Sequence, residues 1–366
     1  MQNSHYTFSI IPRTLVFHRP AGTSRGVMHT HTVWYVVLTN AAGQSGIGEC
    51  APLPGLSCDA LPPKDYETAL HQACTTLART GQLTHTTLEK TPSILFGLET
   101  ALQHLQASSF ALWPTAFARS EAGIPINGLV WMGDYPYMLQ QIEAKLAQGF
   151  RCIKLKIGAL DFSRELALLR HIRAAFSPSD ITIRVDANGA FSPAEAPEKL
   201  SRLAEFHLHS IEQPIAKGQW EALAALTANT PLPIALDEEL IGLTTLAEKE
   251  ELLRTVAPQY LVLKPSLHGG LHGTRQWLDL AAKHGVGWWL TSALESNIGL
   301  NAIAQWCATL APTLPQGLGT GLLYTNNLPF GLAVQQDTLW FSPTHMQQLC
   351  PYSTCPTTLK SYCSSM

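Results

Sequence analysis

The sequence predicts a β/α barrel preceded by a smaller α+β domain, because the two parts of the chain order their elements differently. In the first part, strand-like runs come first and helical runs follow, which is typical of an α+β module. From about Ile124, short apolar runs alternate with amphipathic segments, as in parallel β/α units. Seven or eight such units favour a closed barrel, and the first apolar run lacks the glycine-rich turn of an open dinucleotide-binding sheet.

Individual elements can be placed in both parts. In the first part, β-branched and aromatic residues predict strands at residues 7–19, 32–40 and 45–52, and composition predicts helices over Tyr66–Thr76 and Ile94–Leu105. Barrel strands are expected at residues 125–130, 151–158, 180–188, 208–214, 232–239, 259–265 and 286–294. Barrel helices are expected at residues 137–148, 164–176, 196–206 and 274–285. An eighth unit, near Gly317–Leu323, is faint.

Composition and charge argue against several kinds of partner. Charged residues make up 14% of the chain, below the roughly 25% usual in soluble domains, and such a thinly charged surface favours a homo-oligomer. The net charge is −3 without a long run of one sign, so neither nucleic acid nor an anionic membrane is an expected partner. The N-terminus does not resemble a signal peptide and no apolar stretch is long enough to span a membrane, so we expect a cytoplasmic protein.

The eight cysteines form no CxxC pair, which argues against a zinc site. Free, reduced thiols are therefore expected, as is usual in the cytosol. This expectation includes the three cysteines of the C-terminal tail, Cys350, Cys355 and Cys363.

Three acidic residues end consecutive predicted strands of the barrel. Asp186, Glu212 and Asp237 are each separated by about one β/α unit. Because every strand of such a barrel opens its C-terminal end on one face, the three carboxylates should converge. Together they would raise one another's pKa, and a hard divalent cation removes that repulsion because Mg²⁺ prefers oxygen ligands. The spacing therefore predicts a Mg²⁺ site, at which Mn²⁺ could substitute.

Three lysines flank this predicted metal site. Lys154 and Lys156 are two residues apart on one strand, so both should point into the barrel. Lys264 ends a later strand and should face Lys156 across the site. A lysine near other cations has a lowered pKa and can act as a general base. With a cation to stabilise the new charge, the set could remove a proton from the carbon beside the carboxylate of a small-molecule substrate.

Single residues of these types have ordinary explanations. One Asp or Lys at a strand end is usually a solvated cap, whereas five in order at successive strand ends indicate a site. Asn188 is expected to shape the turn after Asp186, with contact to the metal ligands as an alternative. Glu238 and Glu239 are expected to be surface or helix-entry charges, although Glu238 could assist the metal. The chain has no HExxH pattern, and the first barrel strand, at residues 125–133, has no HxH, which argues against a metal-dependent hydrolase.

These motifs resemble the muconate-lactonizing subgroup of the enolase superfamily. The resemblance rests on KLK, VDAN, IEQP, LDEE and LKP and extends from about Ser9 to Trp340. Within the subgroup, the sequence is similar to the branch that eliminates water from a succinyl-substituted cyclohexadiene carboxylate in menaquinone biosynthesis. That finer resemblance is carried by GIGECAPLPGLS, KLKIG, LDEELIG, LVLKPSLHGG and SALESNIGL.

The resemblance implies a modified TIM barrel, (β/α)7β, beneath a capping domain. Residues 1–123 should form the α+β cap together with part of the C-terminal segment, and residues 124–325 should form the barrel. Residues 326–366 should return to the cap and end in a tail. Two glycine- and proline-rich loops, Pro20–Met28 and Pro52–Ser57, should contact the far end of the substrate.

The resemblance also implies roles for single residues. Lys156 would be the general base and then the acid that protonates the departing hydroxyl, while Lys264 would stabilise the enediolate from the opposite face. Lys154 would tune the field and contact the substrate carboxylate. Candidate substrate-binding residues are Ser292, Gly317 with Gly319, and Arg25 in the first capping loop.

Two other functions stay open. The same two lysines could remove and return a proton, giving an N-acylamino acid racemase or a dipeptide epimerase. TSALESNIG lacks the DxD-type pair with which dipeptide epimerases hold an amino group, and this favours dehydration. An inactive barrel that serves as a binding or scaffold protein is disfavoured, because the predicted acid, base and metal residues are all present.

Overall fold

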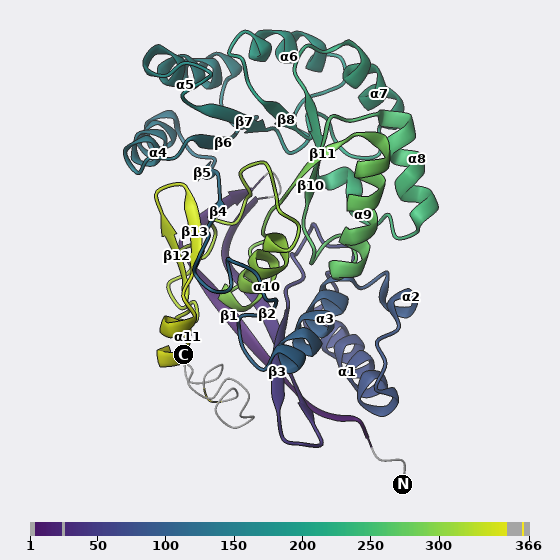
Figure 1. Ribbon diagram of the computed structural model, residues 1–366. Helices are drawn as coiled ribbons and strands as arrows, with labels where there is room; N and C mark the ends of the chain where they lie inside the picture. Colours follow the sequence, from purple (N-terminus) through teal and green to yellow (C-terminus); the bar gives the residue numbers. More distant parts are fainter. Residues whose placement is uncertain (1–3, 24–25, 350–360, 362–366) are drawn as a thin grey trace.

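The computed structural model describes residues 4–23, 26–349 and residue 361. An antiparallel sheet with its own helices lies beside a curved parallel sheet that helices surround (Figure 1). Arg25 and the three tail cysteines lie outside the described residues. The other five cysteines are free, and four of them are buried. No helix in residues 4–23 or 26–349 combines the length and apolar character needed to cross a bilayer.

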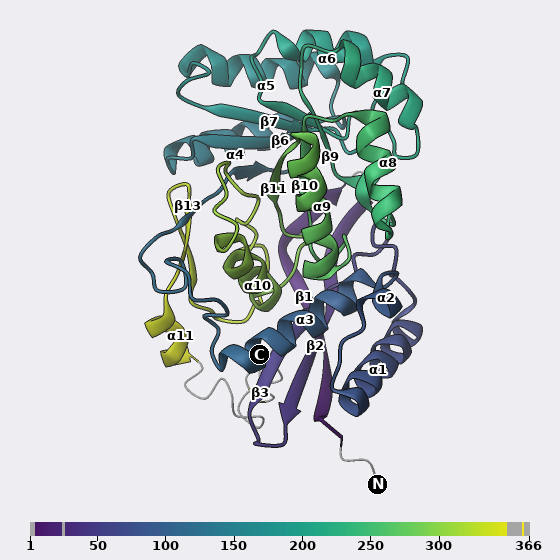
Figure 2. The same ribbon diagram turned by 45° about the vertical axis from the view of Figure 1, so that its right-hand side comes forward.

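The N-terminal part contains the three strands and two helices that the sequence predicts, and one further short helix. Its sheet has the order β1 (Tyr6–Thr23), β2 (Gly26–Asn40) and β3 (Ser45–Cys50), and its helices are α1 (Pro63–Thr80), α2 (His85–Leu88) and α3 (Pro92–Ala107). Helix α3 lies against β3 and beside the barrel helix α9 (Gly270–His284) (Figure 2). The close approach of α3 to β3 requires glycine at position 48, because a Cβ on Gly48 would lie 1.8 Å from the carbonyl oxygen of Gly97 on α3.

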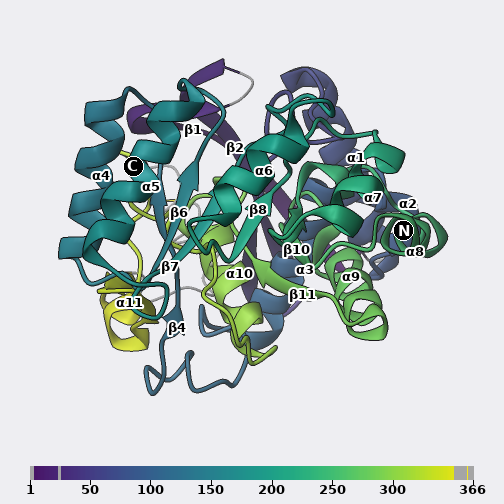
Figure 3. The same cartoon turned by 90° about the horizontal axis from the view of Figure 1, so that it is seen from above.

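The barrel strands pair in parallel and in sequence order, and their helices surround them (Figure 3). The strands are β5 (Gly128–Val130), β6 (Cys152–Lys156), β7 (Thr182–Asp186), β8 (Ser210–Glu212), β9 (Ile234–Leu236), β10 (Tyr260–Leu263) and β11 (Gly287–Leu290). The helices are α4 (Tyr135–Ala147), α5 (Phe162–Ala175), α6 (Ala196–Ala204), α7 (Trp220–Asn229), α8 (Leu246–Val256), α9 and α10 (Asn297–Ala308), with a 3₁₀ turn η1 (Glu238–Leu240).

The faint eighth unit closes this sheet through single bridges. Thr291 pairs in parallel with Gly317, and Ile126 pairs in parallel with Gln316, so residues 316 and 317 occupy the place of an eighth strand. A side chain on Gly317 would collide with Thr291, since a Cβ there would lie 2.3 Å from the Thr291 hydroxyl. The predicted fold class, a modified TIM barrel with an α+β cap, is confirmed.

The predicted first barrel strand, residues 125–130, is divided in the structure. Its start belongs to β4 (Ile124–Pro125), which pairs with β13 (Thr338–Phe341) and, through it, β12 (Leu332–Gln335); helix α11 (Pro343–Leu349) follows. Pro125 has no N–H to donate, and it lies on an edge strand, where that loss is tolerated. The chain then enters the barrel as β5, so the C-terminal segment packs beside the start of the barrel.

A buried polar contact joins the cap to the barrel. Glu49 on β3 accepts hydrogen bonds from the backbone N–H groups of Ser296 and Gly299, each at 2.7 Å. These groups lie at the start of α10, where N–H groups have no partner within the helix. Burial raises the pKa of Glu49 to about 7 despite these bonds. A residue of the cap thus supplies the hydrogen-bond acceptor for the first N–H groups of a barrel helix.

Candidate active site

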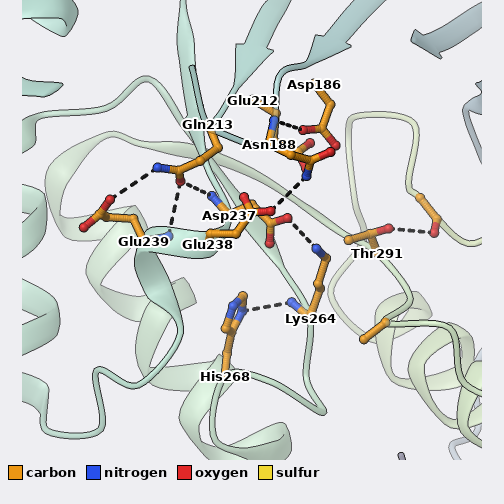
Figure 4. A network of polar contacts seen from close by, with 12 residues as sticks. Asp186, Asn188, Glu212, Gln213, Asp237, Glu238, Glu239, Lys264, His268 and Thr291 are labelled. Atoms are coloured by element: carbon orange, nitrogen blue, oxygen red, sulfur yellow. Dashed lines mark hydrogen bonds and ion pairs between the residues drawn. The ribbon is translucent and has the colours of Figure 1, made fainter. Parts of the chain in front are cut away.

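The three predicted carboxylates meet at the C-terminal mouth of the barrel. Asp186 and Glu212 are register partners on β7 and β8, and Asp237 directly follows β9. Their side chains are almost completely buried. Because parallel strands end on one face, residues distant in sequence become neighbours here. Asp186, Glu212 and Asp237 lie together with Lys264 in Figure 4.

The three predicted lysines bind these carboxylates. Lys154 Nζ lies 2.7 and 2.6 Å from the two carboxylate oxygens of Glu212 and 2.9 Å from Asp186 Oδ2. Lys156 Nζ lies 2.9 Å from the same oxygen of Asp186. Lys264 Nζ donates to Asp237 Oδ2. Strands β7, β8 and β9 separate the strand of Lys156 from the strand that precedes Lys264, so in an eight-membered barrel the two lysines approach from opposite sides.

Burial and charge act in opposite directions on these groups. Burial and the neighbouring Asp186 raise the pKa of Glu212 well above its ordinary value. Burial alone would also raise the pKa of Asp186, but Lys154 and Lys156 outweigh it and lower that pKa.

The pKa values of Lys154 and Lys264 are raised, whereas the sequence led us to expect lowered values. Burial acts to lower the pKa of Lys264, but the carboxylates, Asp237 first, outweigh it and raise that pKa. The pKa of Lys154 is raised for the same reason, since burial is outweighed by Asp186, Glu212 and Asp237. We expected lowered values because we counted a bound cation among the neighbours of the lysines. A positive charge on the carboxylates would remove much of their effect on the lysines.

Asn188 and Glu238 belong to the same network. Asn188 Oδ1 accepts from Lys156 Nζ at 2.7 Å, and Asn188 Nδ2 donates to Glu238 Oε1 at 2.9 Å. Asn188 has a φ of 44°, a left-handed conformation that Asn tolerates better than most residues. The predicted turn is present, and the alternative of contact with the site also holds. Sequence alone could not reveal this contact, because it depends on a loop 50 residues away.

The expectation that Glu238 and Glu239 are surface charges is wrong. Both are only 5% exposed, because η1 turns them inward directly after β9. Glu239 accepts from Trp220 Nε1 at 2.6 Å and from the Gly218 N–H at 2.9 Å. Gln213 also donates to it (Figure 4). A charged pair at the end of an inner strand was the signal that could have indicated burial.

A cavity of about 100 Å³ opens beside Lys156 and Lys264. Its apolar wall includes Leu129 and Trp131, and the adjoining Asn127 also lines it, as expected for alternate residues entering from one strand. Leu53 and Leu56 of the predicted capping loop Pro52–Ser57 cover another side. None of Asn127, Leu129 and Trp131 was predicted as a site residue, although their spacing of two residues along and just beyond the first barrel strand was a signal that could have indicated a shared face.

Of the predicted substrate-binding residues, Ser292 and Gly317 line the cavity, whereas Arg25 lies outside the described residues. Ser292 lines the cavity, but its hydroxyl donates to Glu295 at 2.6 Å. Gly317 and Gly319 also line it, and the Gly317 N–H donates to the Leu290 carbonyl oxygen at 2.8 Å. Any contact of Gly317 with a substrate would therefore have to avoid that N–H. Arg25 lies outside the described residues, so its role stays a prediction.

The chemistry of the carboxylate cluster fits a hard cation. All three side chains offer oxygen, and Asp237 Oδ1 is buried without a hydrogen-bond partner among the described residues. Within the same residues, no three His, Cys, Asp or Glu side chains form a ready-made metal site. The ammonium groups of the three lysines bind the carboxylate oxygens instead. Binding of a cation would therefore exchange part of these ion pairs for metal contacts.

The fold combines a barrel with a cap, and the site combines converging carboxylates with two opposed lysines. Together they define a class of enzyme that acts on the carbon beside a carboxylate. Comparison with known proteins narrows this class. Residues 137–336 match the family described as enolase C-terminal domain-like, and residues 25–105 match the MenC N-terminal domain. The chain belongs to the o-succinylbenzoate synthase family of the enolase superfamily. Members of this superfamily typically bind a divalent metal.

Individual relatives support this assignment. The o-succinylbenzoate synthase of Desulfotalea psychrophila is 49% identical over 361 residues, which cover 90% of this chain and 97% of that protein. The crystal structure of MenC from the same organism has a TM-score of 0.78 and 45% identity, and covers 92% of this chain and 100% of that one. An N-succinylamino acid racemase of an Amycolatopsis species is 30% identical over 184 residues, about half of each chain. The predicted superfamily and branch are thus confirmed.

Proposed function

We propose that this protein is a carbon–oxygen lyase that converts 2-succinyl-6-hydroxy-2,4-cyclohexadiene-1-carboxylate to o-succinylbenzoate in menaquinone biosynthesis. The observation that carries the proposal is the approach of Lys156 and Lys264 from opposite sides to one cavity bounded by buried carboxylates. The 49% identity to an o-succinylbenzoate synthase over nearly the whole chain supports this substrate. The reaction is a syn elimination of water, in which the ring becomes aromatic.

Lys156 carries the proton in this proposal. Its neutral amine takes the proton from the ring carbon that bears the carboxylate, and the C–H electrons pass into the substrate. The resulting ammonium then gives that proton to the hydroxyl on the adjacent carbon. The C–O bond breaks, water leaves, and Lys156 returns to its initial state. Asp186 and Asn188, at 2.9 and 2.7 Å from Nζ, hold the amine in place during both transfers.

Lys264 and Lys154 supply charge rather than proton transfer. Lys264, held by Asp237, places an ammonium on the opposite side from Lys156, where it stabilises the negative charge that develops on the substrate carboxylate. Lys154 lies deeper, against Glu212, and tunes the field at the same carboxylate. The apolar wall of Leu53, Leu56 and Trp131 excludes water, and this strengthens both interactions.

Asp186, Glu212 and Asp237 would hold Mg²⁺, and Mn²⁺ could substitute. The bound ion would supply positive charge for the substrate carboxylate. Ser292, Gly317 and Arg25 remain the proposed contacts for the far end of the substrate. We also propose that residues 1–123 and part of 326–366 act as one cap over the barrel of residues 124–325. A cytoplasmic location and a homo-oligomer stay predictions.

The direct test is turnover of the purified protein with the cyclohexadiene precursor and Mg²⁺. Formation of o-succinylbenzoate, followed by the absorbance of the aromatic ring, is the expected result. The racemase alternative draws support from the Amycolatopsis relative and is tested in parallel with N-succinylamino acids in D₂O. Deuterium incorporation at the α-carbon without turnover of the precursor would replace the lyase by a racemase. Inactivity in both assays would favour the scaffold alternative.

A further inference from the structure

A second cleft lies between the cap and the barrel, apart from the proposed catalytic cavity. Its lining residues come from the α2–α3 region of the cap and from α8, α9 and nearby loops of the barrel. Figure 2 shows how these elements are arranged. Its cavity volume of about 60 Å³ leaves room for a few non-hydrogen atoms. Its polar lining includes the nitrogen-bearing side chains of His85, Lys249, His268 and His272, neutral side chains such as those of Thr86 and Gln276, and the carboxylate of Glu89.

Lys249 is a buried ammonium group without a bound counter-charge. Its side chain is 1% exposed, and Nζ donates to two neutral acceptors, the Gly273 carbonyl oxygen at 3.1 Å and Gln276 Oε1 at 2.7 Å. In the part of the chain that the structure describes, no carboxylate lies within ion-pair distance of Nζ. Burial lowers the pKa of Lys249 to about 8, and the more distant Glu89 and Glu248 offset this only in part. Nζ also lies 5.5 Å from the centroid of the Trp277 ring. A buried charge without a counter-charge is costly, so an anion beside it would be stabilising.

His268 adds a second donor to the same cleft. Its Nδ1 accepts the backbone N–H of Lys264 at 2.9 Å (Figure 4). A nitrogen that accepts carries no proton, so in the neutral ring the proton lies on Nε2. Nε2 is buried and has no hydrogen-bond partner among the described residues. Since buried donors nearly always have a partner, this one indicates an acceptor that the chain itself does not provide.

The other carboxylates near this cleft are already engaged. Glu99 accepts from the N–H groups of Leu271 and His272, at 2.5 and 3.0 Å, and pairs with His85 at 3.4 Å. Glu248 forms the capping box at the start of α8. Glu89 is the remaining acidic residue of the lining, and it opposes an incoming anion.

We propose that this cleft binds one small oxyanion, a phosphate or the carboxylate of a small molecule, through Lys249 Nζ and His268 Nε2. His85 and His272, whose rings stack at 4.3 Å, also line it. The site is distinct from the carboxylate-binding site of the proposed lyase. The two sites are adjacent, however, because His268 of the cleft accepts the backbone N–H of Lys264.

The test uses the full-length protein and titrates inorganic phosphate and, separately, acetate, with a bulky sulfonate as the balancing anion. Calorimetry should show saturable binding of one equivalent of at least one of the two, and the one that binds identifies the source of the oxyanion. Lys249→Met should weaken binding at least about tenfold, since a charge-assisted hydrogen bond is lost. Without the anion, the variant should melt no lower than wild type, because it removes an uncompensated buried charge.

Glu89→Gln is the matched variant, and it should bind the anion more tightly because the opposing carboxylate is gone. Saturable binding of neither anion to wild type, or unchanged affinity in Lys249→Met, overturns the proposal. Should Lys249→Met fail to fold, wild-type crystals soaked in selenate provide a second measurement. An anomalous peak between Lys249 and His268 supports the site, and a featureless cleft in well-diffracting crystals refutes it. A negative result in either binding experiment leaves the outcome of the lyase assay unchanged, so the two proposals are tested separately.

Discussion

Lys156 and Asn188 are joined by a hydrogen bond of 2.7 Å between Nζ and Oδ1, and Asn188 adopts a left-handed backbone conformation where it makes this bond. The amide of Asn188 also donates to Glu238 Oε1, so its orientation is fixed from both ends. The proposed general base is therefore positioned by a residue of the loop after the neighbouring strand. This relationship can be tested separately from the metal ligands.

Replacing Asn188 should lower turnover more than it changes substrate affinity. In Asn188→Ala, Lys156 loses one of its two anchors, and we expect kcat to fall by roughly 10–100-fold with little change in KM, as for other supporting hydrogen bonds at such sites. Asn188→Gly is the matched control, because it accepts the positive φ without strain and lacks the amide. Equal losses in the two variants assign the effect to the amide. Normal turnover in Asn188→Gly would instead assign it to backbone strain.

The arginine variants of the two opposed lysines should differ. Lys156→Arg keeps the charge but cannot deprotonate at ordinary pH, so it should be as inactive as Lys156→Ala, a loss of at least roughly 10²–10⁴-fold. Lys264→Arg should retain measurable dehydration, because the proposed role of Lys264 is to supply positive charge. Steady-state rates with the cyclohexadiene precursor measure both. In a two-base racemase, both arginine variants would be equally inactive, and wild type would exchange the α-proton of an N-acylamino acid with solvent.

Removal of divalent metal should abolish turnover and lower the melting temperature. Ligand binding to the folded state alone raises its stability, so Mg²⁺ added to chelator-treated protein should raise Tm and restore activity, and Mn²⁺ should do the same. Asp237→Asn should lose the Mg²⁺-dependent rise in Tm. Full activity in chelator, or an unchanged metal response in Asp237→Asn, would contradict the proposed ligand set.

Stability should fall as pH decreases from about 6.5 to about 4, in part because of His104. Burial lowers the pKa of His104 to about 4, so between these values the unfolded chain binds a proton that the folded chain does not. The shift corresponds to about 3 kcal/mol of stability, present above the unfolded-state pKa and lost as the pH falls towards the folded-state value.

The control for this prediction is His104→Leu. It removes the titrating group but leaves the N–H of Ile47 without its acceptor, which now lies at 3.1 Å. The variant should be less stable than wild type at pH 7.5, and the difference should shrink towards pH 4. Urea unfolding at several pH values measures this difference. A gap that stays constant with pH would exclude His104 as the source.

Much of the site could be predicted from the sequence because a parallel barrel converts spacing into position. Asp186, Glu212 and Asp237 follow one another at one β/α unit each, and every strand ends on the same face. The alternation of side chains along a strand likewise placed Lys154 and Lys156 on the inner face, where the structure has them. These are local rules, so the residue order alone was sufficient for the positions. The roles of these residues stay predictions.

Other features depended on contacts between segments far apart in sequence, and these only the tertiary structure decided. Glu49 meets Ser296 across 247 positions, and the bridges at residues 316 and 317 complete the barrel without a recognisable strand. The sequence predicts Glu238 as a surface charge, but in the folded protein it is buried beside Asn188. Periodicity reports which face of its own element a residue occupies. What covers that face depends on packing between elements, and no local pattern encodes it.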